Sequence, residues 1–445
     1  MNLHAKLLAR AAGGRPIRAA HIGAGKFGSM FLHQARRMPG LHVLGIADLS
    51  IPGARAALAR VHWPEGSYDA ANLDDASASG GTHLTQDTMA LIADPRVDVV
   101  VEATGNPAAG LRHARHAIAH GKHVVMVNVE ADVLAGPLLA LEAQAAGVVY
   151  SMAYGDQPAL VCEMVDTLRA AGFTIVAAGK GTKYLPIFHA STPDTVWDFY
   201  GLRPEAARAG GMNPQMFNSF LDGTKSGIEM AAIANATGLD VPEDGLAFPP
   251  AGTSEIPNIL RPHNAGGVLP HAGMVEVISS LRRDGSDIAD NLRWGVYAVF
   301  EGDTEYARRC FAEYGVATDS TGRYAALWRP YHFIGLELGV SIASAALRGE
   351  ATGSAAAWRG DVAAVAKRDL WRGEVLDGEG GALVWGKCIP AARARSLGSV
   401  PIGLAHGVAL ARDVPMGAIL TNEDLDAVLS GDAAAIRAEM VARCG

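Results

Sequence analysis

Apolar and polar positions alternate along the first third of the chain as expected for strands followed by helices. A short apolar run at residues 17–22 leads directly into a glycine-rich segment at 23–28, and apolar residues with helical spacing follow at 30–35. A second apolar run at 42–47 closes on Asp48. Further strand-like runs, separated by amphipathic segments, follow at 97–101, 122–127 and 148–153. This alternation predicts an α/β fold with a parallel, doubly wound sheet.

The pattern changes in the rest of the chain. From residue 157 to about 348, glycine and proline interrupt polar stretches and the regular alternation is lost. We therefore expect three domains: a Rossmann domain at 1–156, a mixed α+β catalytic domain at 157–350 and a small all-β module at 351–445.

The last segment contains an internal repeat. Residues 366–376 resemble residues 410–420, with an offset of 44. Each copy is expected to form a strand, a charged turn ending in glycine, and a second strand. Two copies are too few for a solenoid, so the repeat predicts a compact pseudo-symmetric β module with a role in packing or assembly.

Composition excludes several classes of protein. The 445 residues carry a net charge of −8 and 49% hydrophobic residues, which argues against disorder and against a nucleic-acid or anionic-lipid surface. The four cysteines lie far apart, so we expect reduced thiols and no disulfide scaffold. The N-terminal residues lack the apolar run of a signal peptide, and the apolar run at 333–347 is too short to span a membrane. A soluble, cytoplasmic protein is expected.

The glycine-rich segment has the spacing of a dinucleotide-binding fingerprint. Gly23 would allow the tight turn, Gly25 would let a pyrophosphate approach the backbone, and Gly28 would let the helix pack against the strand. An acidic residue follows 20 positions after Gly28, as the fingerprint requires. Ligands of such sheets bind beyond the carboxyl ends of the strands. The remaining residues expected at the cofactor are Lys26, Phe27, Thr104, Gly105 and Asn128.

Asp48 bears on the choice of cofactor. A carboxylate at this position accepts a hydrogen bond from a ribose 2′-hydroxyl and repels a 2′-phosphate, which favours NAD. Ser50 and Arg55 follow closely and would receive a 2′-phosphate if Asp48 turned away.

The middle segment contains the residues with the strongest chemical signal. Lys183 and Lys225 lie in glycine-containing loops, where an ammonium group and the backbone can both approach an anion. Asp222 precedes Lys225 by three positions in a loop that enters an apolar helix, so the two are candidates for proton transfer to and from a substrate oxygen. The same segment also predicts a helix start capped by the hydroxyl of Thr224 or Ser226, with Glu229 as the capping-box partner.

Four features together resemble a known family. They are the Gly23–Gly28 fingerprint, the segment Lys-His-Val-Val-Met-Val-Asn at 122–128, the segment Phe-Leu-Asp-Gly-Thr-Lys-Ser at 220–226, and the repeated Arg-Asp-(x)3-Gly module. The chain resembles the deoxyxylulose-phosphate-reductoisomerase-like oxidoreductases, a second class of these enzymes that is related to homoserine dehydrogenases. The C-terminal module resembles a SAF domain.

This resemblance implies an NADPH-dependent reductoisomerase that converts 1-deoxy-D-xylulose 5-phosphate to 2-C-methyl-D-erythritol 4-phosphate in isoprenoid precursor synthesis. It implies a divalent cation such as Mg²⁺ or Mn²⁺, whose ligands the sequence does not identify, and a homodimer built on the middle domain. Lys225 and Asp222 would be the proton-transfer pair, and Lys183, Arg323 and Arg329 would bind the phosphate. NADPH is preferred because Arg55 offers a contact for the 2′-phosphate, with NAD(H) as the alternative.

Two other functions stay open. The first is a dehydrogenase of the homoserine-dehydrogenase-like kind, acting on another polyol, sugar acid or hydroxy acid with NAD or NADP. The second is a non-catalytic nicotinamide-sensing protein, for which Asp222 and Lys225 would have no purpose.

Overall fold

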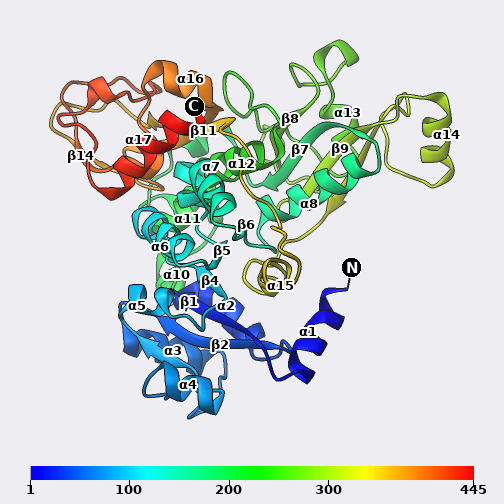
Figure 1. Ribbon diagram of the computed structural model, residues 1–445. Helices are drawn as coiled ribbons and strands as arrows, with labels where there is room; N and C mark the ends of the chain where they lie inside the picture. Colours follow the sequence, from blue (N-terminus) through cyan, green and yellow to red (C-terminus); the bar gives the residue numbers. More distant parts are fainter. Residues whose placement is uncertain (1, 210) are drawn as a thin grey trace. The chain divides into compact units, whose positions relative to one another are not determined.

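The computed structural model describes residues 2–209 and 211–445 (Figure 1). The described chain forms two compact units. The first contains the chain up to Leu160 and then His332–Ala355, and the second contains Val161–Tyr331 and Ala356–Gly445. The predicted division into three domains stays a prediction about sequence modules, because the middle and C-terminal segments fold into one compact unit.

The first unit is built on a six-stranded parallel sheet in the order β3-β2-β1-β4-β5-β6. This order reverses between β1 and β4, as in doubly wound dinucleotide-binding sheets, so the predicted fold class is confirmed. The inner strands are apolar on both faces, which is typical of a sheet covered by helices on both sides. The strands are β1 (Ile17–Ile22), β2 (Leu41–Ala47), β3 (His83–Thr85), β4 (Val99–Glu102), β5 (His123–Met126) and β6 (Tyr150–Met152).

Helices follow the strands of this sheet in chain order (Figure 1). They start at side chains suited to capping: Ser50, Asn106 and Asn128 each accept a backbone N–H in the first turn of their helix. The helices are α1 (Leu3–Ala12), α2 (Lys26–Ala35), α3 (Ile51–Arg60), α4 (Leu73–Ser79), α5 (Thr88–Ala93), α6 (Pro107–Ala119) and α7 (Val129–Ala145).

One helix of the first unit comes from far along the chain. In α15 (Gly339–Arg348), Ile342 and Ala343 join the core that surrounds Phe31 of α2. The Ser341 hydroxyl donates to the Met152 carbonyl at 3.1 Å and accepts from the Tyr154 N–H at 2.7 Å. We expect the middle domain to reach residue 350, whereas the structure includes this helix in the first unit, because its apolar face is buried against α2 and the end of β6.

The second unit contains a four-stranded mixed sheet in the order β10-β9-β7-β8, in which β7 and β8 are parallel and the other pairs antiparallel. Its strands are β7 (Thr174–Thr182), β8 (Met274–Ser279), β9 (Val296–Glu301) and β10 (Tyr324–Arg329). The helices of this part are α8 (Gln157–Ala170), which runs across the boundary of the units, α9 (Val196–Tyr200), α10 (Pro204–Ala209), α11 (Pro214–Leu221), α12 (Thr224–Thr237), α13 (Ile256–Ile259) and α14 (Glu305–Glu313). Short 3-10 turns lie at η1 (Pro186–Ala190) and η2 (His263–Ala265).

The C-terminal segment adds two antiparallel strand pairs to the second unit. β11 (Gly360–Ala366) pairs with β13 (Val384–Pro390), and β12 (Val375–Asp377) pairs with β14 (His406–Ala409). The expectation of an all-β module is incomplete, because α16 (Ala391–Leu397) and α17 (Asp432–Cys444) also belong to it. The 3-10 turns η3 (Ile402–Leu404) and η4 (Asn422–Asp424) complete the segment. Helix α12 contacts β11 and β13 as well as β7 and β8, which explains why it is buried on nearly every side.

The internal repeat folds with reciprocal contacts. The Asp369 carboxylate accepts from the Met416 N–H, and the Asp413 carboxylate accepts from the Arg372 N–H, both at 2.8 Å. Each contact is related to the other by the offset of 44 residues. The two copies therefore pair with each other about a local pseudo-twofold axis.

Across the part of the chain that the structure describes, no helix has both the length and the apolar character needed to cross a membrane.

Candidate active site

The turn between β1 and α2 has the geometry that a dinucleotide phosphate needs. Gly23 has φ +93°, and a Cβ there would lie 2.8 Å from the Ala103 carbonyl oxygen. A Cβ on Gly28 would lie 2.2 Å from the Gly23 carbonyl oxygen, so only glycine lets the helix approach the turn. Gly25 is the N-cap of α2 without a capping side chain, and apart from its chain neighbours no atom of the described residues lies within 4 Å of where its Cβ would be. The first turn of α2 begins at Lys26 and Phe27, and backbone N–H groups at the start of a helix are of the kind that bind an anion.

A buried histidine lies directly beneath this turn. His21, the penultimate residue of β1, is fully buried and packs against the Phe31 ring, with centroids 5.3 Å apart. Burial lowers the pKa of His21 from 6.5 to about 4, so the ring is neutral at physiological pH. We assign it a packing role.

Asp48 lies at the end of β2 and binds the glycine turn. Its carboxylate accepts from the Ala24 N–H and from the Ser50 N–H, both at 2.8 Å. Arg55, the residue proposed for a 2′-phosphate, forms an ion pair with Asp69, and its guanidinium carbon lies 5.7 Å from the centroid of the Tyr68 ring. A 2′-phosphate would therefore have to compete with Asp69 for Arg55 and would meet the negative charge of Asp48.

The other predicted cofactor residues follow β4 and β5 at the same edge of the sheet. The Thr104 hydroxyl donates to the Glu102 carboxylate at 2.5 Å, and Gly105 has φ +68°. Asn128 caps α7 by accepting from the Ala131 N–H at 3.1 Å. Glu102, which sequence analysis did not single out, is fully buried and orients Thr104. Its only sequence signal is an acidic residue at the end of an otherwise apolar strand.

Asp222 and Lys225 flank the start of α12. The Asp222 side chain is fully buried, and its carboxylate accepts from the Lys367 ammonium at 2.7 Å and from the Thr224 N–H at 2.8 Å. Lys225 is the second residue of the helix and is half-buried. The geometry gives Asp222 a positioning role in the loop that carries Lys225.

The predicted cap of α12 is wrong. The N-cap is Gly223, with φ +94° and no capping side chain. The Thr224 hydroxyl instead accepts from the Gly386 N–H at 2.8 Å, and Glu229 forms a buried ion pair with Lys180. The missing cap is explained by Asp222, whose carboxylate binds the first N–H of the helix from outside.

An aromatic and histidine cluster that sequence analysis missed covers this helix start. The His189 Nδ1 atom lies 2.7 Å from the Asp222 carbonyl oxygen, and its Nε2 atom lies 2.8 Å from the Tyr184 hydroxyl. A carbonyl can only accept, so Nδ1 carries the hydrogen and Tyr184 donates to Nε2. The His189 ring stacks on Trp385 at 3.8 Å, and Tyr184 stacks on Phe248 at 4.1 Å. Burial lowers the pKa of His189 and raises the pKa of Tyr184.

Of the three residues predicted for the substrate phosphate, two lie at one edge of the four-stranded sheet and the third lies at the opposite edge. Lys183 directly follows β7 and Arg329 ends β10; the strand register brings these two ends to one edge of the sheet. Arg323 precedes β10 at the opposite edge and forms an ion pair with Glu301. Strand pairing thus separates two arginines that are close in sequence. Arg293, in the loop before β9, lies at the same edge of the sheet as Lys183, and both side chains lie over the Tyr200 ring. No pattern in the sequence pointed to Arg293.

Within the described residues, no group of three His, Cys, Asp or Glu side chains is placed to hold a metal ion. The divalent cation that the resemblance implied stays a prediction.

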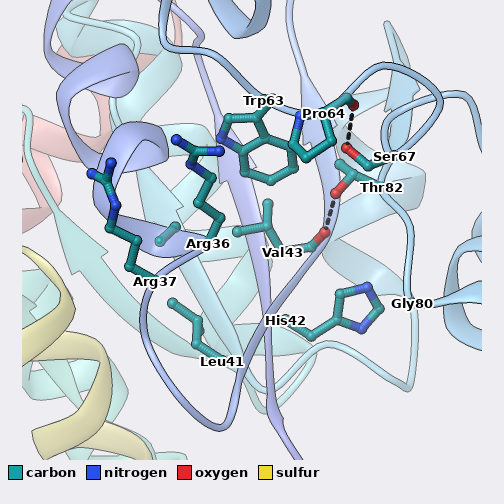
Figure 2. Close-up of a pocket in the computed structure, with 11 residues that line it drawn as sticks. Arg36, Arg37, Leu41, His42, Val43, Trp63, Pro64, Ser67, Gly80 and Thr82 are labelled. Atoms are coloured by element: carbon teal, nitrogen blue, oxygen red, sulfur yellow. Dashed lines mark hydrogen bonds between the residues drawn. The ribbon is translucent and has the colours of Figure 1, made fainter.

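The first unit also has a pocket of about 480 Å³ away from the cofactor turn, at the amino end of β2. Figure 2 shows the Trp63 indole over Val43, with the Arg36 and Arg37 side chains at one side. Its hydroxyl groups are engaged internally, since Thr82 donates to Val43 and Ser67 donates to Pro64, both at 2.7 Å. None of the predicted site residues lines this pocket.

Two segments of the chain match models of known protein families. Residues 23–151 match the model of the homoserine dehydrogenase NAD-binding domain, and residues 155–338 match the model described as oxidoreductase DRL, catalytic domain. No protein of curated function matches the chain. The C-terminal repeat lies outside both matched ranges, so its resemblance to a SAF domain stays a prediction.

The solved structures that match the chain share little sequence with it. A homoserine dehydrogenase from Thiobacillus denitrificans is 24% identical, with 51% of this chain and 50% of that chain covered and a TM-score of 0.36. The putative oxidoreductase yvaA from Bacillus subtilis is 14% identical, with 76% and 91% covered and a TM-score of 0.37. A DOX-P reductoisomerase in complex with magnesium is 19% identical, with 48% and 56% covered and a TM-score of 0.32. The chain spans about half the length of the first solved structures that it matches.

The parallel sheet, its glycine turn and the two family matches define an NAD(P)-dependent oxidoreductase. More particularly, its nucleotide-binding domain is similar to that of homoserine dehydrogenases, and its middle segment is similar to the catalytic domain of the DRL oxidoreductase.

Proposed function

We propose that this protein is an NADPH-dependent reductoisomerase that converts 1-deoxy-D-xylulose 5-phosphate to 2-C-methyl-D-erythritol 4-phosphate. The observation that carries the proposal is the match of residues 155–338 to the DRL catalytic domain, together with the Asp222–Lys225 segment inside that range. In this reaction the substrate carbon skeleton rearranges to an aldehyde. NADPH bound at the glycine turn would supply the hydride that reduces the aldehyde, and a proton from the protein would complete the alcohol.

The side chains of the second unit have defined parts in this scheme. Lys225 is the residue we assign to proton transfer at the substrate oxygen. Asp222 holds the start of α12 through the Thr224 N–H and is itself held by Lys367. His189 and Phe248 close the other side of Gly223, since a Cβ on Gly223 would lie 3.1 Å from the His189 ring and 3.6 Å from the Phe248 ring.

A second candidate function is a dehydrogenase that acts on another polyol, sugar acid or hydroxy acid. The environment of Asp48 and Arg55 favours it, because a carboxylate at the end of β2 and an arginine already paired with Asp69 suit NAD better than NADP. Such an enzyme would need the same hydride chemistry and no rearrangement of the substrate.

The experiment that tests the proposal is a turnover assay of the purified chain with deoxyxylulose phosphate and a panel of sugar acids, each with NADPH and NADH. Turnover of deoxyxylulose phosphate with NADPH is expected. Turnover of a sugar acid alone would overturn the reductoisomerase in favour of the dehydrogenase. Tight NAD(P)H binding without turnover of any substrate would favour a nicotinamide sensor.

Lys225 provides a residue-level test. Lys225→Ala should lower kcat by roughly 100- to 10,000-fold, the usual contribution of a positioned acid or base, while NADPH binding stays unchanged. Lys225→Arg keeps the charge but cannot release a proton near neutral pH, so it should also be impaired. Activity close to that of the wild type in the alanine variant would contradict the assignment.

We also propose a homodimer, which size-exclusion chromatography with light scattering tests directly.

A further inference from the structure

Two cationic side chains, Lys183 and Arg293, lie at one edge of the four-stranded sheet. In the register of the sheet, Lys180 of β7 and Arg329 of β10 both pair with Val296, the first residue of β9. The end of β7, the start of β9 and the end of β10 therefore lie at the same edge. Lys183 follows β7 at this edge, and Arg293 precedes β9.

Gly181, near the end of β7, allows the loop before β9 to approach this strand closely. A Cβ on Gly181 would lie 1.9 Å from the Leu292 carbonyl oxygen and 3.1 Å from the Arg293 nitrogen. The Gly181 N–H donates to the Gly295 carbonyl at 3.1 Å. Only a residue without a side chain fits at position 181, so the backbone itself holds the Arg293 loop against the end of β7.

Both cations lie over the same aromatic ring. The Lys183 ammonium is 5.6 Å from the centroid of the Tyr200 ring, and the Arg293 guanidinium carbon is 5.9 Å from it. The Arg293 guanidinium also lies 4.8 Å from the centroid of the Trp294 ring. Each side chain is half-buried. Burial, and then the positive charge of Arg293, lower the pKa of Lys183, while the exposed Asp287 acts weakly in the opposite direction.

Arg293 differs from three other arginines of the second unit in its ion pairing. Arg261, Arg282 and Arg323 each form an ion pair with an acidic side chain. Arg293 pairs with no carboxylate among the described residues, and its guanidinium contacts are the two aromatic rings. The Lys183 ammonium donates to the Phe199 carbonyl at 2.5 Å, and this neutral acceptor does not cancel its charge. Two adjacent half-buried cations that pair with no carboxylate among the described residues form a site prepared for an external anion.

We propose that Arg293 and Lys183 bind the anionic group of the substrate, a phosphate or a carboxylate. A guanidinium presents paired N–H groups that match two oxygens of either anion, and the Tyr200 and Trp294 rings hold it in place before the ligand arrives. The Lys183 ammonium supplies the second charge. Calling the ligand a substrate rests on the proposed function, whereas anion binding at Arg293 does not.

The test is a binding titration of the full chain with inorganic phosphate and, separately, with gluconate, at constant ionic strength, followed by calorimetry. Arg293→Ala should weaken binding of the preferred anion roughly tenfold to hundredfold, the usual worth of a hydrogen bond to a charged group. Arg293→Lys, which keeps the charge without the paired donors, should lie between the two. Arg309→Ala is the matched control, because the Arg309 guanidinium lies 5.5 Å from the Tyr306 ring of α14, outside the proposed site.

The outcomes separate the proposed anion site from the proposed function. Tighter phosphate binding assigns a phosphorylated substrate, and tighter gluconate binding assigns a sugar acid; both support the site. Equal affinity in the wild type and in Arg293→Ala, or an equal loss in Arg309→Ala, would overturn it. NAD(P)H binding, measured by fluorescence on the same samples, tests the proposed function independently. A wild type that binds anions through Arg293 but no nicotinamide nucleotide would refute only the proposed function.

Discussion

Two helices of this protein, α2 and α12, follow a turn that contains a glycine with nearly the same positive φ, but the surroundings of their N-termini differ. Gly23 has φ +93° and Gly223 has φ +94°. The start of α2 has no capping side chain and open space at Gly25, whereas the start of α12 is covered by Asp222, His189 and strand β13. We therefore expect a glycine turn before a helix to serve a ligand where no side chain caps the helix start, as at α2, and not where the start is covered, as at α12.

The largest effect on stability is expected from removing the Lys367 charge, which neutralises the Asp222 carboxylate at the start of α12. Lys367→Met leaves the Asp222 carboxylate buried and unpaired, which should destabilise the protein by about 3–5 kcal/mol. Denaturant unfolding monitored by tryptophan fluorescence measures this loss. The double variant Lys367→Met, Asp222→Leu should recover much of it, because an apolar pair of similar volume is tolerated where a single charge is not.

A matched control for this prediction is Lys387→Met, which removes a half-buried lysine of β13 and should change the unfolding free energy little. If Lys367→Met were no more destabilising than Lys387→Met, the Asp222–Lys367 pair would not hold the helix start.

The two glycines provide the most direct test of the comparison. Alanine at either position adopts a strained left-handed conformation that costs about 1–3 kcal/mol of stability. Gly23→Ala should in addition abolish NAD(P)H binding, because its Cβ displaces the turn that forms the phosphate site. Gly223→Ala should keep NAD(P)H binding. Fluorescence titration with NADH and NADPH distinguishes them, and equal loss of nucleotide binding in both variants would refute the difference between the two helix starts.

A smaller effect is expected on the pH dependence of stability, through Glu276, which holds a residue that covers the start of α12. The Glu276 carboxylate, buried in β8, accepts from the Ala247 and Phe248 N–H groups and so holds the Phe248 ring over Tyr184. Burial raises the pKa of Glu276 from 4.5 to about 7. The folded state therefore binds this proton more tightly than the unfolded state, and the stability that it contributes is complete below pH 4.5 and is lost as the pH rises through 7.

Glu276→Gln should remove this part of the pH dependence. We expect the Tm of the wild type to fall by a few degrees more than that of the variant between pH 5 and pH 8. Parallel Tm profiles for the two proteins would contradict the shifted pKa of Glu276.

The sheet of the first unit was predictable because each strand is a short apolar run followed by polar residues. Strand β3 was missed, since its three residues carry too little pattern. The predicted run at 333–347 was assigned to its neighbours in sequence, although its apolar face is buried against α2 and β6 in the first unit. Apolar periodicity reports that a face is buried and does not report against what.

The candidate site was predictable only where a local motif existed. The glycine fingerprint is local, so Gly23, Gly25 and Gly28 could be found. Lys367 acts on Asp222 across 145 residues, and no pattern in the sequence joins them. Arg293 lies in an ordinary loop, and its position depends on the strand register.

The discontinuity of the first unit has a practical consequence for dissecting the protein. A fragment that stops at residue 160 would contain all six parallel strands but would lack α15, and so would expose the part of its core that Ile342 and Ala343 cover. A nucleotide-binding fragment therefore has to carry residues 332–355 as a grafted second segment. The same topology protects the intact enzyme, because a single cut at residue 331 leaves each unit covalently joined to the other through the remaining crossings of the chain.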